Sequence, residues 1–268
     1  HEKGANMSRE KELAALSRIE ARMKERNGHL GFYYKNLVTG LTFGCREEEA
    51  FLAASVIKLP LFLHILSRAH EGTLNMTDTI RVTDDKKVPV CGAVTLFTGE
   101  PEVDIWTLCR LMISLSDNTA TNLLLDYCTI EDVTAGFRTM GLEKTCVQRR
   151  LFDAEASAQG KQNRICPREM GDLLERLYRK TFVSEDVSQA AIDTLFLQQI
   201  NHKLDGKLCG AVPIAHKTGE DDELSNDVGI VYAPQPFVIC FAGHDTDVYP
   251  WETIIREGTY DLVMAQNN

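Results

Sequence analysis

Ser55 and Lys58, three positions apart, carry the side chains of a nucleophile and of a base that could activate it. They open an apolar-rich stretch, from Ala54 to about His70, that predicts a helix, and residues three apart on a helix share one face. A lysine can take the proton of a serine hydroxyl only where burial or a nearby cation lowers the pKa of its amine. The apolar neighbours Phe51 and Ile57 could supply that burial. The pair predicts acyl transfer through a serine, although a helix-opening serine and a surface lysine are commoner when this spacing stands alone.

The triplet Ser116-Asp117-Asn118 follows an apolar run, Leu111 to Ile113, and precedes a helical pattern from Thr119 to Leu125. Serine, aspartate and asparagine are all good helix N-caps, which is the structural explanation of the triplet. The functional explanation makes Ser116 a proton shuttle and Asn118 a donor and acceptor for a substrate amide.

The third motif is His216-Lys217-Thr218-Gly219, at the end of a predicted strand that begins at Val212. A strand-end lysine and hydroxyl followed by a glycine suit a substrate carboxylate that lies along the strand, with the backbone close enough to bond to it. A turn with a solvated lysine is the alternative. The three motifs lie far apart in sequence, so the fold must bring them together.

The elements that would position these motifs alternate between strands and helices along the chain. Strands are predicted at both chain ends, and helical periodicity dominates between them, interrupted by a polar stretch expected to be a long surface loop. The expectation is an α/β (α+β) fold: a five-stranded antiparallel sheet from both chain ends, flanked by terminal helices, with an all-helical insertion. The sheet region comprises residues 7–75 and 205–268, and the helical region comprises residues 76–204, with the loop at 149–166. The predicted strands are His29–Lys35, Leu41–Cys45, Val212–Lys217, Ser225–Tyr232 and Pro236–Gly243; the other predicted helices are Ser8–Arg26, Ile105–Leu115, Thr119–Tyr127, Ile130–Met140, Pro167–Arg179, Ser188–Gln199 and Trp251–Met264.

Composition narrows the possible partners. The 268-residue chain is 44% hydrophobic and 25% charged, which is ordinary for a globular protein, and its net charge of -10 argues against nucleic acid or an anionic membrane as a partner. The longest apolar stretch, Phe51 to Leu66, is broken by a lysine, a proline and a histidine, so no membrane span is expected. No secretion signal is recognisable; it is absent or removed, and the compartment stays open. We expect a monomer.

The eight cysteines are scattered without a C-x-x-C pair, which favours mostly buried free thiols over a disulfide framework. The seven histidines show no zinc-binding spacing. No metal or organic cofactor is expected, because serine, lysine and backbone donors suffice for acyl transfer.

The order S-x-x-K, S-D-N, K-T-G, on a helix start, an interhelical loop and a late strand, resembles that of class A β-lactamases and penicillin-binding proteins. The likeness covers nearly the whole chain, and the segment Leu111–Leu125 is especially similar to class A. The resemblance implies that Ser55 is acylated, that Lys58 is its base or proton relay, and that Ser116 passes the proton to the leaving nitrogen.

The same resemblance assigns the substrate contacts. It implies that Asn118 holds the side-chain amide, that Lys217 and Thr218, with Gly219 behind them, meet the carboxylate, and that the backbone N–H groups of Ser55 and Glu220 form the oxyanion hole. A buried cluster of this kind is chemically coherent, because cationic Lys217 would lower the pKa of Lys58.

The long loop departs from the class A pattern. The glutamate that activates the deacylating water there is replaced by Leu151, two residues after Arg149, which we expect to pin the loop by a salt bridge. Asp153 and Glu155 are possible substitutes as the base, or are structural. This loop resembles class A-like penicillin-binding proteins more than efficient lactamases.

The sequence therefore predicts a serine β-lactamase-like hydrolase that acts on β-lactams through a Ser55 acyl-enzyme and deacylates slowly. The alternatives are a D-alanyl-D-alanine carboxypeptidase, a small-molecule esterase or amidase, and a ligand sensor that is acylated once.

Overall fold

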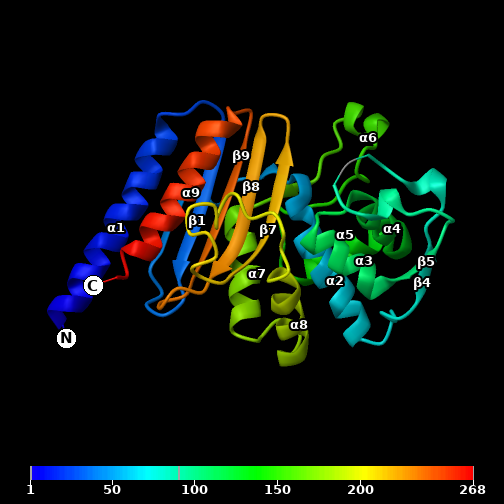
Figure 1. The fold of residues 1–268 in the computed structure, drawn as a ribbon, viewed down its shortest axis with the longest axis horizontal. Helices are drawn as coiled ribbons and strands as arrows, with labels where there is room; N and C mark the ends of the chain where they lie inside the picture. Colours follow the sequence, from blue (N-terminus) through cyan, green and yellow to red (C-terminus); the bar gives the residue numbers. More distant parts are fainter. Residues whose placement is uncertain (1, 90, 268) are drawn as a thin grey trace.

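An antiparallel sheet built from both ends of the chain forms one half of the molecule (Figure 1). The computed structural model describes residues 2–89 and 91–267. The five strands lie in the order β2-β1-β9-β8-β7, which leaves β7 at the edge beside the helical half. Their bounds are β1 His29–Asn36, β2 Thr42–Cys45, β7 Ile214–Asp221, β8 Leu224–Val231 and β9 Phe237–His244. The predicted fold class and all five predicted strands are confirmed, with ends shifted by a few residues.

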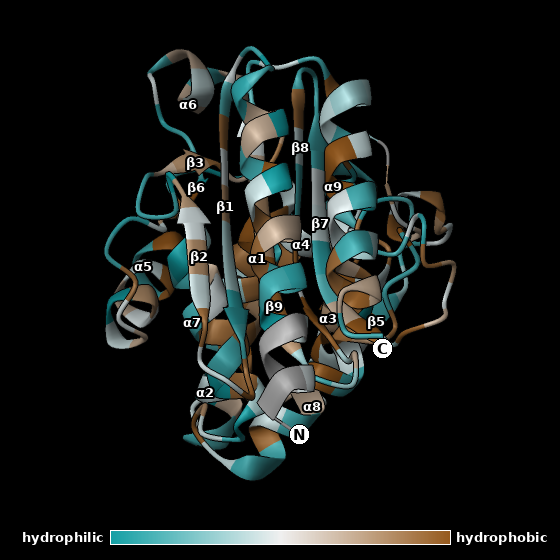
Figure 2. Cartoon of the chain, turned by 90° about the vertical axis from the view of Figure 1, so that its left-hand side faces the viewer, coloured by the Kyte–Doolittle hydropathy of each residue, from teal (hydrophilic) through white to brown (hydrophobic). Residues whose placement is uncertain are grey.

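Two terminal helices, α1 (Glu2–Lys24) and α9 (Val248–Met264), cover one face of this sheet. Their apolar positions, among them Leu16 and Trp251, are fully buried against the sheet residues Phe32 and Phe241. Figure 2 looks onto these helices, whose ribbons alternate between hydrophilic and hydrophobic colours as one-sided packing requires. They close this face of the sheet and leave its other face to the rest of the chain.

The opposite face packs on α7 (Pro167–Tyr178), and one continuous apolar core runs from there into the helical half. The approach of α7 to the sheet is close: a Cβ atom at Gly171 would lie 2.4 Å from the ring of Tyr33, so only glycine fits there. The remaining helices are α2 Lys58–His70, α3 Ile105–Ser114, α4 Asn118–Cys128, α5 Ile130–Thr139, α6 Ala154–Ala158 and α8 Glu185–Leu195.

The expected all-helical region, 76–204, also contains short strands. β4 (Thr79–Arg81) pairs with β5 (Glu102–Asp104), and β6 (Arg164–Ile165) pairs with β3 (Phe51–Leu52). Strands of two or three residues are too short for a period-two pattern, so the purely helical expectation was wrong in this detail. The division into two regions stays a prediction, because a shared core crosses it.

The long loop 149–166 is likewise more structured than expected. It contains α6 and β6, and three 3₁₀ turns occur elsewhere, at η1 (Ala54–Ile57), η2 (Asp84–Lys86) and η3 (Val94–Leu96). All eight cysteines are free, as predicted, but only four of them are buried, so the expectation that most would be buried was wrong. None of the helices within residues 2–89 and 91–267 combines the length and apolar character that a bilayer crossing needs.

Candidate active site

Ser55 lies in the 3₁₀ turn η1, between the sheet edge and the first turn of α2. The chain before it is held on two sides: Asn226 Nδ2 of β8 donates to Leu52 O and Ala53 O, each at 3.0 Å, while β3 pairs with β6 of the loop. Ala54 then adopts a left-handed φ of 43°, which turns the chain into η1. Ser55 is half-buried at the start of this turn, where the positive end of α2 would favour a developing negative charge.

Gly219 of β7 lies directly against the Ser55 turn. A Cβ atom at this position would be 3.0 Å from Ala53 O and 3.1 Å from the backbone nitrogen of Ser55, tighter than ordinary packing allows. The glycine of the K-T-G motif therefore allows a close approach of the two backbones, and it brings the third motif beside the first.

Lys58 is the centre of the cluster. Its Nζ lies 2.7 Å from Ser116 O, 3.0 Å from Ser116 Oγ and 2.7 Å from Asn118 Oδ1, and its side chain is wholly buried. Burial is the main cause that holds its pKa well below the ordinary lysine value, and the nearby Lys217 adds to it. Burial and charge thus make Lys58 an amine that can accept a proton, which is what a base for serine needs.

The groups around Lys58 Nζ also determine which of them can donate a proton to its lone pair. A neutral amine has two N–H bonds, and two acceptors without a proton to give, Ser116 O and Asn118 Oδ1, lie within reach of them. The lone pair is then left for a hydroxyl, either that of Ser116 at 3.0 Å or that of Ser55 one helical turn earlier.

Lys217 approaches the same hydroxyl from the sheet. Its Nζ lies 3.1 Å from Ser116 Oγ and donates to Thr218 O at 2.7 Å. The pKa of Lys217 is lowered to about 7, mainly by its complete burial and in part by Lys203, against the opposing effect of Glu220, Asp227 and Cys91. Ser116, held at a φ of 56°, therefore links two amines from separate parts of the fold.

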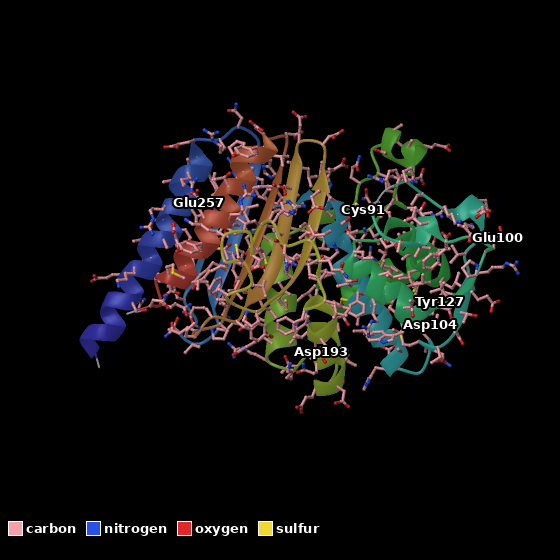
Figure 3. The ribbon with its side chains drawn as sticks, viewed as in Figure 1. Cys91, Glu100, Asp104, Tyr127, Asp193 and Glu257 are labelled. Carbon is pink, nitrogen blue, oxygen red and sulfur yellow. The ribbon has the colours of Figure 1, made fainter. Side chains whose placement is uncertain are left out.

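The middle residue of the S-D-N triplet is structural. Asp117 Oδ1 caps α4 by accepting from Ala120 N, and Oδ2 accepts from Ala93 N and Val94 N at 2.7 and 2.9 Å. These bonds hold the segment after Cys91, an exposed residue whose carbonyl accepts from Asn118 N. Figure 3 labels Cys91 between the sheet edge and the helical half, at the rim of the cluster.

Thr218 offers a polar group that the protein itself does not use. Its side chain is fully buried, and its Oγ1 has no hydrogen-bond partner among the described residues. An unsatisfied buried hydroxyl costs about 1–3 kcal/mol, so a ligand acceptor placed there would be favoured. This fits the predicted role of Thr218 toward a substrate carboxylate.

Glu220 of β7 has its backbone N–H on the open edge of the sheet. Tyr232 N donates to Pro213 O, and the register continues without interruption to Asp221. In an antiparallel ladder bonded pairs alternate, so the odd-numbered residues of β7 bond to β8 and the even-numbered ones point away from it. The backbone N–H of Glu220 therefore faces the Ser55 side, as an oxyanion-hole donor must.

The loop is bonded to α4 through Leu151. Asn122 Oδ1 accepts from Leu151 N at 2.8 Å, and Asn122 Nδ2 donates to Leu151 O at 2.9 Å. Asn122 lies four residues after Asn118 on α4, so both share one helix face. The backbone of Leu151 is thereby fixed to the side chain of Asn122, which lies one helical turn after the residue that contacts Lys58.

The expected salt bridge of Arg149 is wrong. Its guanidinium donates to Gln162 Oε1 at 3.2 and 3.4 Å and to Arg150 O at 3.0 Å. Asn163 completes the loop closure by accepting from Gln148 N and Arg149 N. The amide oxygen of Gln162 and a backbone oxygen accept the hydrogen bonds of the Arg149 guanidinium, so no carboxylate is needed to satisfy it.

The two acidic residues of the loop, Asp153 and Glu155, lie at the start of α6. Asp153 Oδ1 accepts from Ala156 N at 3.0 Å and caps α6, and Glu155 is exposed in the first turn of that helix. The structure gives Asp153 a capping role, and a role of either residue as the base stays a prediction.

The electrostatics of Lys217 predict a pH limit on acylation. The predicted role of Lys217 toward a substrate carboxylate needs a protonated amine, so kcat/KM is expected to fall as the pH rises through about 7, the pKa of Lys217 in the free enzyme. Progress curves with a penicillin from pH 5.5 to 9 would measure this. The variant Lys217→Arg keeps its charge at every such pH and is expected to lose the alkaline limb; the same limb in both proteins would contradict the assignment.

Known proteins resemble the chain over most of its length. A model of the Beta-lactamase enzyme family matches residues 11–257. A beta-lactamase of Rhodobacter capsulatus is 34% identical over 132 residues, 48% of this chain and 44% of the relative. The extended-spectrum beta-lactamase PER-1 of Pseudomonas aeruginosa is 27% identical over 202 residues, 69% of this chain and 64% of the relative. The matches thus span 44% and 64% of these two relatives.

Two solved structures share the fold almost completely. An ancestral class A beta-lactamase superposes with a TM-score of 0.84 at 25% identity, covering 94% of this chain and 99% of that one. A leucine-to-glutamate mutant of PBP-A, solved as an acyl-enzyme complex with penicillin G, gives a TM-score of 0.83 at 23% identity, covering 97% and 96%. The second likeness concerns the fold alone.

Proposed function

Because the chain belongs to the Beta-lactamase enzyme family, we propose that it is a serine hydrolase that opens β-lactam rings through an acyl-enzyme on Ser55 and releases the product slowly. The observation that supports this most is the convergence of two buried lysines on Ser116 Oγ, at 3.0 and 3.1 Å, beside the turn that carries Ser55. A structural cluster would not need two desolvated amines on one hydroxyl, since burying charge is costly.

Acylation follows from these positions. Ser55 Oγ attacks the carbonyl carbon of the β-lactam and gives its proton to the neutral amine of Lys58. The negative charge on the carbonyl oxygen is stabilised by the N–H groups of Ser55 and Glu220. The carbon–nitrogen bond then breaks, and the leaving nitrogen takes a proton from Ser116, which recovers one from Lys58. An ester on Ser55 remains and Lys58 is neutral again.

Substrate binding uses the sheet edge. The substrate carboxylate lies at Lys217 and Thr218 Oγ1, the hydroxyl that lacks a partner among the described residues. Asn118, which also contacts Lys58, binds the side-chain amide of the substrate. No group in this scheme requires a cofactor, because proton transfer and oxyanion stabilisation come from protein groups.

Slow release follows from the loop. Hydrolysis of the ester needs a base to activate water, and Leu151, whose backbone Asn122 fixes, has no proton acceptor in its side chain. A second candidate is a D-alanyl-D-alanine carboxypeptidase, which would use the same groups on an open peptide.

Intact-protein mass spectrometry tests the proposal. After incubation with penicillin G, the native protein is expected to gain the mass of one penicillin, and Ser55→Ala to gain none, because only Ser55 can form the ester. Native protein that neither gains the mass nor hydrolyses the penicillin would reject a β-lactam substrate. An equal adduct on Ser55→Ala would place the nucleophile elsewhere.

A further inference from the structure

We propose that Glu220 is a specificity-determining residue that restricts the site to substrates with a single carboxylate. It does so by pairing with Lys203, a cation near the position of the substrate carboxylate, and so balancing its charge. The inference rests on the proposed function and adds to it the charge of the preferred substrate. It comes from an ion pair that no part of the acylation scheme uses.

The ion pair lies on the substrate side of the sheet edge. Alternate residues of a strand project to the same face, so the side chains of Thr218 and Glu220 share one face of β7. Thr218 Oγ1 is the hydroxyl left for the substrate carboxylate. The next side chain along that face is therefore the carboxylate of Glu220.

Lys203 forms an ion pair with the carboxylate of Glu220. Its side chain is fully buried, and its Nζ lies 2.7 Å from Glu220 Oε1, 2.8 Å from Asn226 O and 3.1 Å from Ser225 Oγ. Burial alone would raise the pKa of Glu220, but Lys203 overrides it and the pKa lies below the ordinary value. Glu220 is therefore ionised, and it keeps a third of its side-chain surface exposed toward the solvent.

The charge available to a substrate follows from this pairing. Without Glu220, Lys203, whose Nζ lies 3.3 Å from Gly219 O of the same strand, would add a second positive charge to that of Lys217; with Glu220, the charge of Lys203 is balanced. One substrate carboxylate binds to Lys217 and Thr218. A second carboxylate beside the first would meet the negative charge of Glu220 and find no free cation, and like charges this close are strongly disfavoured.

A matched pair of substrates measures this selectivity. N-benzoyl-D-alanyl thioesters of mercaptoacetate and of mercaptosuccinate differ in one carboxylate on the leaving group, and loss of thioester absorbance follows both without a thiol reagent. The readout is the ratio of kcat/KM for the dicarboxylate to that for the monocarboxylate, which reports acylation. Glu220→Gln, a near-isosteric change that leaves Lys203 charged and unpaired, is expected to raise this ratio about tenfold.

Two further variants isolate the cause. The double variant Lys203→Met with Glu220→Gln removes both charges, and its ratio of kcat/KM is expected to return to the native value. Glu257→Gln removes an equal charge from α9, where Glu257 pairs with Arg22 at 2.6 Å far from the site, and is expected to keep the native ratio (Figure 3). A second readout is the alkaline limb of kcat/KM, which should move to lower pH in Glu220→Gln because Glu220 raises the pKa of Lys217.

Each outcome decides between the proposals. A higher ratio in Glu220→Gln alone supports the inference. An unchanged ratio in Glu220→Gln, or the same gain in the double variant, overturns it while the proposed function stands. Native protein that is acylated neither by the monocarboxylate thioester nor by penicillin G would overturn the proposed function itself.

Discussion

Replacing Leu151 by glutamate is expected to speed hydrolysis of the penicillin adduct about a hundredfold, the usual lower range for a positioned general base. The backbone of residue 151 is already fixed by the two bonds to Asn122, and Asn122 lies one helical turn after Asn118, which contacts Lys58. We expect a carboxylate introduced there to reach the ester with little reorganisation of the loop. Decay of the adduct after removal of free penicillin, followed by intact mass, gives the rate.

Leu151→Gln is the matched control for this change. Glutamine has the size and polarity of glutamate without its basicity, so its adduct should decay at close to the native rate. Equal acceleration by both variants would show that loosened packing or water entry, and not a missing base, limits deacylation in the native protein. No acceleration by glutamate would mean that position 151 does not face the ester.

Replacing Lys58 by methionine is expected to slow acylation by penicillin G about a thousandfold, because the buried amine is the only base on the face of Ser55 in the described cluster. Methionine nearly matches the length of the lysine side chain and is tolerated in buried positions, which limits the damage to packing. The adduct should still form on Ser55, slowly. Stopped-flow or quenched samples analysed by intact mass measure the rate.

Lys207→Met controls for the loss of a lysine as such, since Lys207 lies on the surface with its Nζ 4.3 Å from the ring of Tyr260. It is expected to acylate at the native rate. Thermal melts of both variants would show whether each is folded. A folded Lys58→Met protein that acylates as fast as the native one would remove Lys58 from the mechanism.

The predictable part of the site came from motifs whose spacing has a physical meaning. Ser55 and Lys58 share a helix face, and Lys217 ends a strand, so a sheet with a helical insertion was enough to predict that they meet. The contacts of Ser116 with both lysines agree with that prediction. The strands and helices were predicted well because their periodicity extends over many residues.

The parts that could not be predicted depend on tertiary contacts. Asn122 gave one signal, its position four residues after Asn118 on the same helix, but its partner in the loop is set only by folding. The pairing of Lys203 with Glu220 joins residues whose sequence neighbours show no pattern. The short elements in the loop likewise fall below the length at which a period can be recognised.

The direct test of the account is a nitrocefin reaction followed from milliseconds to an hour. Fast formation and slow hydrolysis of a Ser55 ester predict a burst of colour equal to one equivalent of protein, followed by a slow steady rate. Linear, rapid turnover from the first seconds, without a burst, would contradict the account, because the ester would then be hydrolysed as fast as it forms.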